Sequence, residues 1–322
     1  MKSPLRADGP RLLADIGGTN ARFGWQAGPD APITHVHTYA CAQSPSPLAA
    51  MRRYLADMAH TAPRLAAVGI ANPVTGDAVN MTNHHWSFSV KALEAALGVE
   101  RLVVINDFEA LALALPALDA HETVQIGGGE AVPGAPIALI GPGTGLGMAG
   151  LVAVDERWVA IAGEGGHATL SPETPREMAV AQWLRQRFGH ASVERAVSGP
   201  GLVWLYEALA ELDGESPEST LAAADVAERA HAGTDPRASE ALMMFLAFLG
   251  CAAGNLALTL GARGGVYIGG GIVPRLVGMV QASPLLERFC SKGRMKPLLQ
   301  PIPLRVITAL DSPALRGVAR AL

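Results

Sequence analysis

Apolar residues along the first third of the chain occur either in short runs or at the spacing of one helical face. The short runs predict strands, whereas in residues 47–60 the apolar residues recur at helical spacing. Ser89 and Gly98 are the expected N-cap and stop of a further helix. The expected strands are 11–16, 20–26, 33–40, 65–71 and 101–106, and the expected helices are 47–60, 89–98 and 107–116. Strands that alternate with helices indicate a parallel or mixed sheet covered on both faces.

The pattern starts afresh at Pro136. PIALIGPGTGLGMAGLVAV predicts a strand, a glycine turn and a return strand, and RWVAIAG predicts a third strand. Helices are expected at residues 174–188, 199–212, 219–232, 236–260 and 312–322, and further strands at 264–271 and 303–308. ADIGGTNARFG and LIGPGTGLGMAG each predict a strand, a turn of small residues that contains Gly-Thr, and a return strand. The chain therefore contains the same three-strand beginning of a domain twice. Two similar α/β halves, in a chain of 322 residues, indicate two domains with a small-molecule cleft between them.

Composition and charge narrow the class of protein. The net charge is −4 and no cluster of Lys and Arg is present, so we expect no nucleic-acid partner. Three cysteines, far apart and odd in number, argue against a disulfide framework or a zinc knuckle and favour a reducing cytoplasm. The opening MKSPLRADGP lacks the apolar stretch of a signal peptide, which also suits a cytoplasmic protein.

Residues 241–262 form an uncharged segment that is long enough to cross a bilayer. A helix that is apolar on all sides is equally suited to the centre of a large domain. Gly250, Gly254 and Asn255 interrupt the segment, and no other part of the chain resembles it. We therefore expect a buried helix and no membrane partner.

Two glycine-rich turns follow strand-like runs. DIGGTN contains Gly17, Gly18 and Thr19, and GPGTGLG contains Gly143 and Thr144. One such turn alone is most simply a tight hairpin. Glycine also allows backbone N–H groups to surround a phosphate, and a threonine hydroxyl adds a donor. Because two such turns occur at matched places, we expect them to hold a polyphosphate together.

These turns are not the common nucleotide motifs. No lysine follows the glycines, as GxxxxGK[ST] requires, and GPGTGLG precedes a strand where a dinucleotide fingerprint would open a helix. Asp15, beside the first turn, is suited to hold Mg²⁺ directly or through water. In YIGGGIVPRL, Gly269, Gly270 and Gly271 end a strand and would let adenine or ribose approach the backbone, and Pro274 would open the next helix.

Several polar residues are candidates for chemistry. Asp107 follows a buried strand, at the edge of an α/β sheet where ligands bind. It is a good N-cap for the next helix, and as a functional residue it would accept a proton from an attacking hydroxyl. Glu164 and His167 in AGEGGHATL would bind vicinal hydroxyls; metal ligation is the alternative, although no HExxH pattern or cysteine partner supports it. Glu194 in SVERAVSGPGL is a further acceptor that, alone, resembles any surface glutamate.

The segment MTNHHWSFS adds candidates for sugar binding. Asn83 offers an amide and Trp86 an aromatic face, which are groups that sugars favour. His84 and His85 are expected to be exposed loop histidines.

With these residues in view, the chain resembles the bacterial glucokinase family, whose fold is the actin-like, ribonuclease H-like fold of sugar kinases. The resemblance runs from ADIGGTNARFG through GGVYIGGGI to the final helix, and so covers essentially the full length. DIGGTNARF is similar to the family's first phosphate segment, GPGTGLG to the second and YIGGGIVPRL to the adenosine segment. The positions matching the phosphate segments are Asp15, Gly17, Gly18, Thr19, Asn20, Gly143, Thr144 and Gly145. Asp107 matches the catalytic base, and the positions matching sugar contacts are Asn106, Glu164, His167 and Glu194.

The resemblance implies a small domain of residues 1–116 with 310–322, a large domain of residues 117–309 and an active site in the cleft between them. It implies ATP and Mg²⁺ as cofactors and glucose, phosphorylated at its 6-hydroxyl, as the substrate, with a homodimer as a possible assembly. The cysteine cluster and N-terminal DNA-binding helix pair of the related repressor–kinase group are missing from this sequence. We therefore expect an enzyme rather than a sugar-responsive transcription factor.

Three alternatives stay open at this point. The first is a kinase for another hexose, such as mannose, fructose or N-acetylmannosamine, because one pocket contact decides between epimers. The second is a non-catalytic sugar-sensing protein on the same fold, which the presence of Asp107 disfavours. The third and most distant is a nicotinamide oxidoreductase. The phosphoryl donor (ATP, ADP or polyphosphate), the oligomeric state and regulation are not decided by the sequence.

Overall fold

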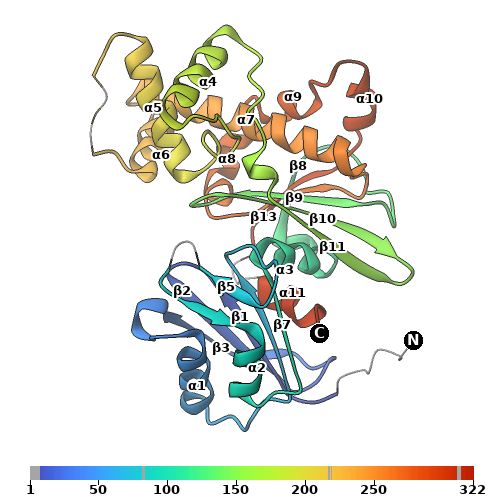
Figure 1. The fold of residues 1–322 in the computed structure, drawn as a ribbon. Coiled ribbons are helices and arrows are strands. Elements are labelled where there is room, and N and C mark those ends of the chain that lie inside the picture. The colour runs from blue at the N-terminus through green and yellow to red at the C-terminus, as the bar shows by residue number, and fades with distance from the viewer. Residues whose placement is uncertain (1–7, 82–83, 217, 219, 310–312) are drawn as a thin grey trace. The chain divides into compact units, whose positions relative to one another are not determined.

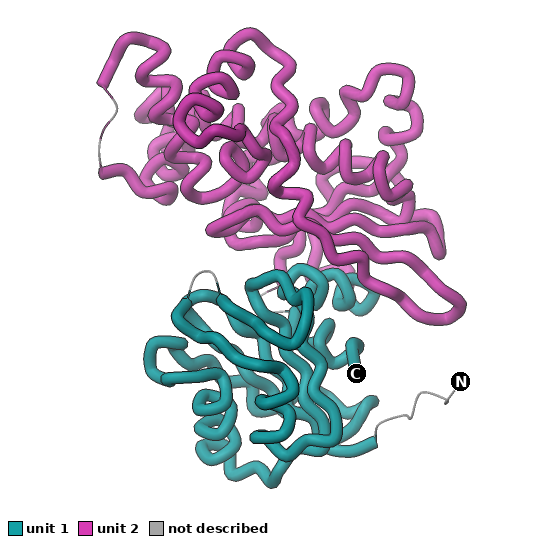
Figure 2. The backbone as a smooth tube through the Cα atoms, in the orientation of Figure 1, with its two compact units in different colours: residues 1–118, 310–322 teal, residues 119–309 magenta. Residues whose placement is uncertain are grey.

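The computed structural model describes residues 8–81, 84–216, 218, 220–309 and 313–322 (Figure 1). The chain divides into two compact units (Figure 2). Unit 1 consists of Met1–Leu118 with Leu310–Leu322, and unit 2 of Asp119–Ala309. Each unit contains a main sheet and several helices, so the expected mixed α/β class is confirmed.

Unit 1 is built on a five-stranded sheet with the order β3-β2-β1-β4-β7. β1, β2 and β3 form an antiparallel meander, whereas β1, β4 and β7 run parallel. A small antiparallel hairpin of β5 and β6 is separate from this sheet. The strands are β1 (Arg11–Ile16), β2 (Asn20–Gln26), β3 (Ile33–Ala40), β4 (Leu65–Ile70), β5 (Ala78–Asn80), β6 (Ser87–Ser89) and β7 (Arg101–Asn106).

Helices cover both faces of this sheet because successive strand residues point to opposite sides. Leu13 belongs to one apolar cluster, with α3 and α11, whereas its neighbours Leu12 and Ala14 belong to another, with α1 and α2. The C-terminal helix α11 approaches α3 closely at Gly317, where an added Cβ would overlap the Ala110 carbonyl oxygen. The helices are α1 (Pro47–Asp57), α2 (Val90–Leu97), α3 (Asp107–Ala114) and α11 (Ala314–Arg320).

Unit 2 repeats this plan in a six-stranded sheet with the order β11-β10-β9-β12-β13-β8. β9, β10 and β11 form the antiparallel meander, and β9, β12 and β13 run parallel. The additional strand β8 pairs antiparallel with β13. The doubled opening inferred from the sequence is therefore confirmed. The strands are β8 (Thr123–Gly127), β9 (Ile137–Pro142), β10 (Leu146–Val154), β11 (Arg157–Gly163), β12 (Val266–Ile268) and β13 (Leu304–Ile307).

The helices of unit 2 follow the expected segments, except that α6 begins at Ala223 rather than at residue 219. They are α4 (Pro175–Phe188), α5 (Gly199–Leu212), α6 (Ala223–Ala232), α7 (Pro236–Leu260), α8 (Val277–Val280), α9 (Leu285–Cys290) and α10 (Lys296–Leu299). The sequence did not indicate β5, β6, β8, α9 or α10, because elements this short carry little periodicity. The helix expected to open at Pro274 is a 3₁₀ turn, Val273–Leu276, followed directly by the short helix α8.

The apolar segment 241–262 lies within α7, a core helix of unit 2. Among the described residues, α7 is the one helix long and apolar enough to cross a membrane, and 78% of its most apolar 18-residue window is buried inside the protein. Gly250 and Gly254 lie where α7 meets α9, since an added Cβ would overlap the carbonyl oxygens of Leu285 and Phe289. The expected buried helix is confirmed, and its glycines serve helix packing.

Candidate active site

The first glycine turn joins β1 to β2. The Gly17 N–H donates to the Asn20 carbonyl oxygen at 2.9 Å, and the side chains of Thr19 and Asn20 are exposed. Among the described residues, a Cβ added at Gly17 would have only that carbonyl oxygen nearby, at 3.6 Å. The turn does not require glycine at this position for its own packing. The space beside the backbone is therefore available to an external group such as a phosphate.

Asp15 and Asp107 lie at the same edge of the unit 1 sheet. Asp15 precedes the last residue of β1, and Asp107 begins α3 directly after β7. Both strands run parallel to β4, which lies between them. The negative charge of Asp15 reaches Asp107 and raises the pKa of its carboxyl group. The edge that the sequence predicted as a ligand site thus brings two carboxylates near each other.

The pKa of the Asp107 carboxyl group is raised to about 6. Withdrawal from water is the larger cause, and the charge of Asp15 is the second. A hydrogen bond from the Phe108 N–H to Asp107 Oδ1, at 2.9 Å, acts in the opposite direction. A carboxyl group with this pKa is mainly ionised at neutral pH and is a better proton acceptor than an ordinary aspartate, as a general base requires.

Asn106, and not Asp107, caps α3. The Asn106 side-chain oxygen accepts hydrogen bonds from the N–H groups of Phe108 at 2.8 Å and Glu109 at 3.3 Å. Its amide donates to the Asn72 carbonyl oxygen at 3.4 Å. The interpretation of Asp107 as the N-cap is therefore wrong, because the capping side chain comes from the residue before the first helical one. The role of Asn106 as a sugar contact stays a prediction.

The second glycine turn, between β9 and β10 in unit 2, is connected to the start of α5. The Gly143 N–H donates to the Gly145 carbonyl oxygen at 2.8 Å, and the Gly199 N–H donates to the Gly143 carbonyl oxygen at 2.8 Å. A Cβ added at Gly143 would have no neighbour within 4 Å, and the Thr144 side chain is exposed. As in the first turn, the backbone is open to an external group.

Two other glycines pack directly against this second turn. A Cβ at Gly166 would overlap the Leu146 carbonyl oxygen, and a Cβ at Gly270 would overlap the Pro142 carbonyl oxygen. Gly270 also has a φ of +79°, a left-handed conformation that favours glycine. Segments far apart in the sequence therefore hold the turn in place through glycine contacts.

The predicted sugar-binding residues of unit 2 converge. His167 Nε2 lies 3.9 Å from a Glu164 carboxylate oxygen, and His167 Nδ1 lies 3.9 Å from a Glu194 carboxylate oxygen. The side chains of Glu164 and His167 are more than half exposed, whereas that of Glu194 is 26% exposed. The other Glu194 oxygen accepts a hydrogen bond from the Leu146 N–H at 2.9 Å. Glu194 thus links this cluster to the second glycine turn.

A short ladder of backbone hydrogen bonds brings the cluster together. The Val193 N–H donates to the Ala168 carbonyl oxygen at 2.9 Å, and the Glu194 N–H donates to the Gly166 carbonyl oxygen at 2.8 Å. Exposed carboxylate and imidazole groups in this arrangement are suited to accept hydrogen bonds from sugar hydroxyls. Across the described parts of the chain, no group of three or more His, Cys, Asp or Glu side chains is arranged to hold a metal ion.

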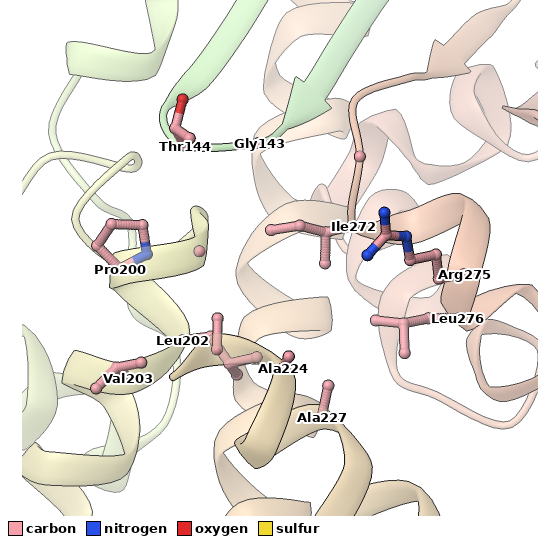
Figure 3. A pocket seen from close by; sticks show the side chains of 13 residues that line it. Gly143, Thr144, Pro200, Leu202, Val203, Ala224, Ala227, Ile272, Arg275 and Leu276 are labelled. Atoms are coloured by element: carbon pink, nitrogen blue, oxygen red, sulfur yellow. The ribbon is translucent and has the colours of Figure 1, made fainter. Parts of the chain in front are cut away.

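A pocket of about 650 Å³ lies beside the second turn, within unit 2 (Figure 3). α5 begins at this pocket, and Ser198 caps it by accepting a hydrogen bond from the Gly201 N–H at 3.0 Å. The N-terminal end of a helix carries partial positive charge, which favours a phosphate. The lining residues are Gly143, Thr144, Gly199, Pro200, Leu202, Val203, Ala223, Ala224, Ala227, Gly271, Ile272, Arg275 and Leu276.

Only part of the predicted nucleotide set lines the pocket, namely Gly143, Thr144 and Gly271. Gly145 makes room for the Glu194 side chain. The Gly269 N–H donates to the Ile140 carbonyl oxygen at 2.8 Å, inside the sheet. The lining contributed by α5, α6 and the 3₁₀ turn Val273–Leu276 was not predicted from the sequence. The N-cap Ser198 and the glycines of SGPGL could have indicated a helix start suited to a ligand at α5. The alanines that α6 contributes to the lining carry no such indication.

The segment MTNHHWSFS does not provide the aromatic sugar contact that the sequence predicted. Asn83 lies outside the described residues. Trp86 is 1% exposed and its indole N–H donates to the Ser44 carbonyl oxygen at 3.0 Å, so the expectation of an aromatic face for a sugar is wrong. Trp86 is a core residue of unit 1. His85 is exposed as expected, but His84 is half-buried, with its ring edge-on to Trp86.

The sequence of this chain is similar to those of known glucokinases. The sequence model of the family described as Glucokinase matches residues 12–322. A glucokinase of Chromobacterium violaceum is 52% identical over 319 residues, which are 99% of this chain and 91% of that protein. The Bifunctional protein glk of Burkholderia pseudomallei (strain 1710b) is 51% identical over 98% of this chain. The chain spans about half the length of such bifunctional relatives, 49% in this case.

A solved structure is similar over the whole chain. The crystal structure of a glucokinase from an Antarctic psychrotroph superposes with a TM-score of 0.88 at 38% sequence identity. The match covers 97% of this chain and 98% of that one. The two glycine turns, the sheet-edge aspartates and the exposed carboxylate–imidazole cluster therefore occur in a chain that belongs to the glucokinase family.

Proposed function

We propose that this protein catalyses the ATP-dependent phosphorylation of glucose at its 6-hydroxyl, giving glucose 6-phosphate. The observation that carries the proposal is the Asp107 carboxyl group at the sheet edge beside Asp15, with its pKa raised to about 6. Membership of the glucokinase family and the name of the relative that is 52% identical support glucose as the sugar.

We further propose that the chain has the small domain (1–116 with 310–322) and the large domain (117–309) of an actin-like, ribonuclease H-like fold. These domains correspond to the two units, whose boundary lies two residues later, between Leu118 and Asp119. The active site would form in the cleft between them, with ATP phosphates between the two glycine turns and the sugar opposite. The residues proposed to hold the nucleotide are Asp15, Gly17, Gly18, Thr19, Asn20, Gly143, Thr144, Gly145, Gly269, Gly270 and Gly271. The residues proposed to hold the sugar are Asn83, Asn106, Asp107, Glu164, His167 and Glu194.

Mg²⁺ fits the first turn as the ion that accompanies ATP. In nucleotide sites Mg²⁺ is usually held by one or two carboxylates together with phosphate oxygens and water. Asp15 provides a carboxylate beside a turn whose glycine backbone is open. We propose that Asp15 holds the ion, through a water molecule. When bound, the ion would neutralise charge on the phosphates during transfer.

In this proposal Asp107 accepts the proton of the sugar 6-hydroxyl as that oxygen attacks the γ-phosphorus in line. Phosphoryl transfer has a loose transition state, so positioning and charge neutralisation contribute more than the strength of the base. Glu164, His167 and Glu194 would orient the sugar ring, and the open glycine backbones would orient the phosphates. Closure of the site would exclude water, which otherwise competes as the nucleophile.

A coupled ADP-release assay over a panel of hexoses tests the proposal. We expect the highest kcat/KM for glucose, with lower values for mannose, fructose and N-acetylmannosamine. A higher kcat/KM for another sugar would identify a kinase for that hexose. Glucose binding without ADP release would identify a sugar-sensing protein. Either of these outcomes would contradict the proposed function.

Glu164→Gln is expected to raise the KM for glucose by about 10- to 100-fold, the usual loss for a hydrogen bond to a charged group. The KM for ATP should stay nearly unchanged, because Glu164 lies beside His167 in the cluster proposed to hold the sugar. Glu194→Ala is the matched comparison. It should raise both KM values, because Glu194 also accepts the Leu146 N–H. Equal effects of Glu164→Gln on sugar and nucleotide would refute this separation of roles.

We also propose a cytoplasmic location and a homodimeric assembly. Cys41, Cys251 and Cys290 are free thiols in the structure, which suits a reducing compartment. Light scattering on the purified protein measures the assembly directly.

A further inference from the structure

The pocket beside the second glycine turn is lined almost entirely by apolar residues and glycines. Of its thirteen lining residues, only Thr144 and Arg275 carry a polar side chain, and the others are glycine, proline, alanine, valine, leucine or isoleucine. No carboxylate or amide side chain is among them. Thr144 belongs to the turn proposed to hold phosphates. The walls away from that turn are therefore apolar except at Arg275.

Arg275 is the one lining residue away from Thr144 with a polar side chain, and that side chain is a hydrogen-bond donor. A guanidinium donates hydrogen bonds and accepts none. Arg275 lies on the same wall as Ile272 and Leu276 (Figure 3), and its side chain is exposed. At the start of α6, Ala222 provides no side-chain cap, and first-turn N–H groups such as those of Ala223 and Ala224 have no acceptor within their own helix.

This lining bears on how a nucleotide base is selected. Adenine presents an amino donor at position 6, whereas guanine and hypoxanthine present a carbonyl acceptor there. To select adenine by that group, a pocket needs an acceptor placed beside it. Among the described residues the walls away from Thr144 offer no acceptor side chain. Apolar walls favour a base by the surface that it buries and do not distinguish adenine from guanine or hypoxanthine by hydrogen bonds.

We propose that this pocket selects purine nucleoside triphosphates by shape and discriminates only weakly among their bases, so that ATP, GTP and ITP all serve as phosphoryl donors. The inference rests on the proposed function, since it takes this pocket as the site of the base. A site that binds a substrate group by hydrogen bonds rejects analogues by about 10⁴- to 10⁵-fold, whereas apolar fit gives only about 10- to 200-fold. A single-ring pyrimidine buries less surface against the same walls and is bound more weakly.

The test measures glucose 6-phosphate formation, so that the readout is independent of the nucleotide used. We expect the kcat/KM values for ATP, GTP and ITP to lie within about 200-fold of one another, the limit for recognition without hydrogen bonds. A larger preference for ATP would overturn the proposal, because it would require an acceptor that reads the amino group.

Ala224→Trp tests whether the base lies in this pocket. Ala224 is an exposed lining residue, so a bulky side chain there fills the pocket without disturbing the core. We expect the KM for all three nucleotides to rise by about tenfold or more, with their ratios and the KM for glucose unchanged. Ala232→Trp is the matched control, since Ala232 is exposed on the same helix and is not a lining residue. If both variants bind nucleotide like the wild type, the base lies elsewhere and the proposal fails.

Calorimetry separates this inference from the proposed function. If the protein transfers no phosphate from any nucleotide and yet binds ATP, GTP and ITP alike, the kinase proposal fails and the weak base selection stands. If it phosphorylates glucose with ATP but neither binds nor uses GTP and ITP, the kinase proposal stands and the base inference fails.

Discussion

Asp107→Ala is expected to lower kcat for glucose phosphorylation by about 10²- to 10⁴-fold, the usual contribution of a positioned general base. The Asp107 carboxylate is proposed to take the proton of the 6-hydroxyl, and water replaces it poorly in a closed site. Glucose binding, followed by calorimetry, should largely survive, because Glu164, His167 and Glu194 lie on another unit of the chain. Turnover close to that of the wild type would show that Asp107 is not the base.

The pH dependence gives an independent check on the same residue. The base must be ionised, so kcat/KM should rise with pH through a limb near pH 6, where the pKa of Asp107 lies, and level off above neutrality. Removal of Asp107 should abolish this limb in the residual activity. A limb that persists at the same pH in Asp107→Ala would have to come from another group.

Stability adds a readout that catalysis cannot affect. Because the pKa of Asp107 in the folded protein is raised above its unfolded value, its stabilising contribution is complete below the unfolded pKa and is lost as pH rises through about 6. Asp107→Asn keeps an oxygen for the Phe108 N–H and removes the charge. The substitution should raise the free energy of unfolding more at pH 8 than at pH 4. The difference between these two effects should be up to roughly 3 kcal/mol. An equal effect at both pH values would mean that the pKa is not raised.

Gly270→Ala is expected to lower the free energy of unfolding of unit 2 by roughly 2 to 4 kcal/mol, from left-handed backbone strain and overpacking together. Gly270 has a φ of +79°, and an added Cβ would overlap the Pro142 carbonyl oxygen. Because Pro142 directly precedes the second glycine turn, relief of the overlap would displace that turn. Nucleotide affinity should therefore fall together with stability, as measured by denaturant unfolding and by calorimetry with ATP.

Gly278→Ala is the control for this substitution. Gly278 lies in α8, and an added Cβ there would meet nothing within 4 Å. Alanine is the better helix former, so this variant should be as stable as the wild type or slightly more stable. If Gly270→Ala and Gly278→Ala unfold alike and bind ATP alike, the packing of Gly270 against the turn does not support the site.

Much of the fold was readable from the sequence because its signals are local. Proline, glycine and capping residues mark where many elements begin and end. For example, α2 begins after the N-cap Ser89 and ends at the left-handed Gly98. The matching glycine turns indicated a duplicated plan, and the two sheets share that plan. Asp107 was identified as a candidate because a residue that follows a buried strand must lie at the ligand-binding edge of the sheet.

The rest was decided by contacts between residues far apart in the chain. Trp86 is a core residue, and Glu194 accepts a hydrogen bond from the distant Leu146 N–H. The cap of α3 is an exception, because Asn106 accepts from the N–H groups of Phe108 and Glu109, which are its near neighbours in the sequence. Local patterns determine where strands and helices begin and end, because caps, turns and periodicity act within a few residues. They do not determine which loop side chain meets which backbone group, because that depends on how distant segments pack. The sequence alone determined most elements and the chemical type of each candidate residue, and tertiary packing decided which of these residues lie close together.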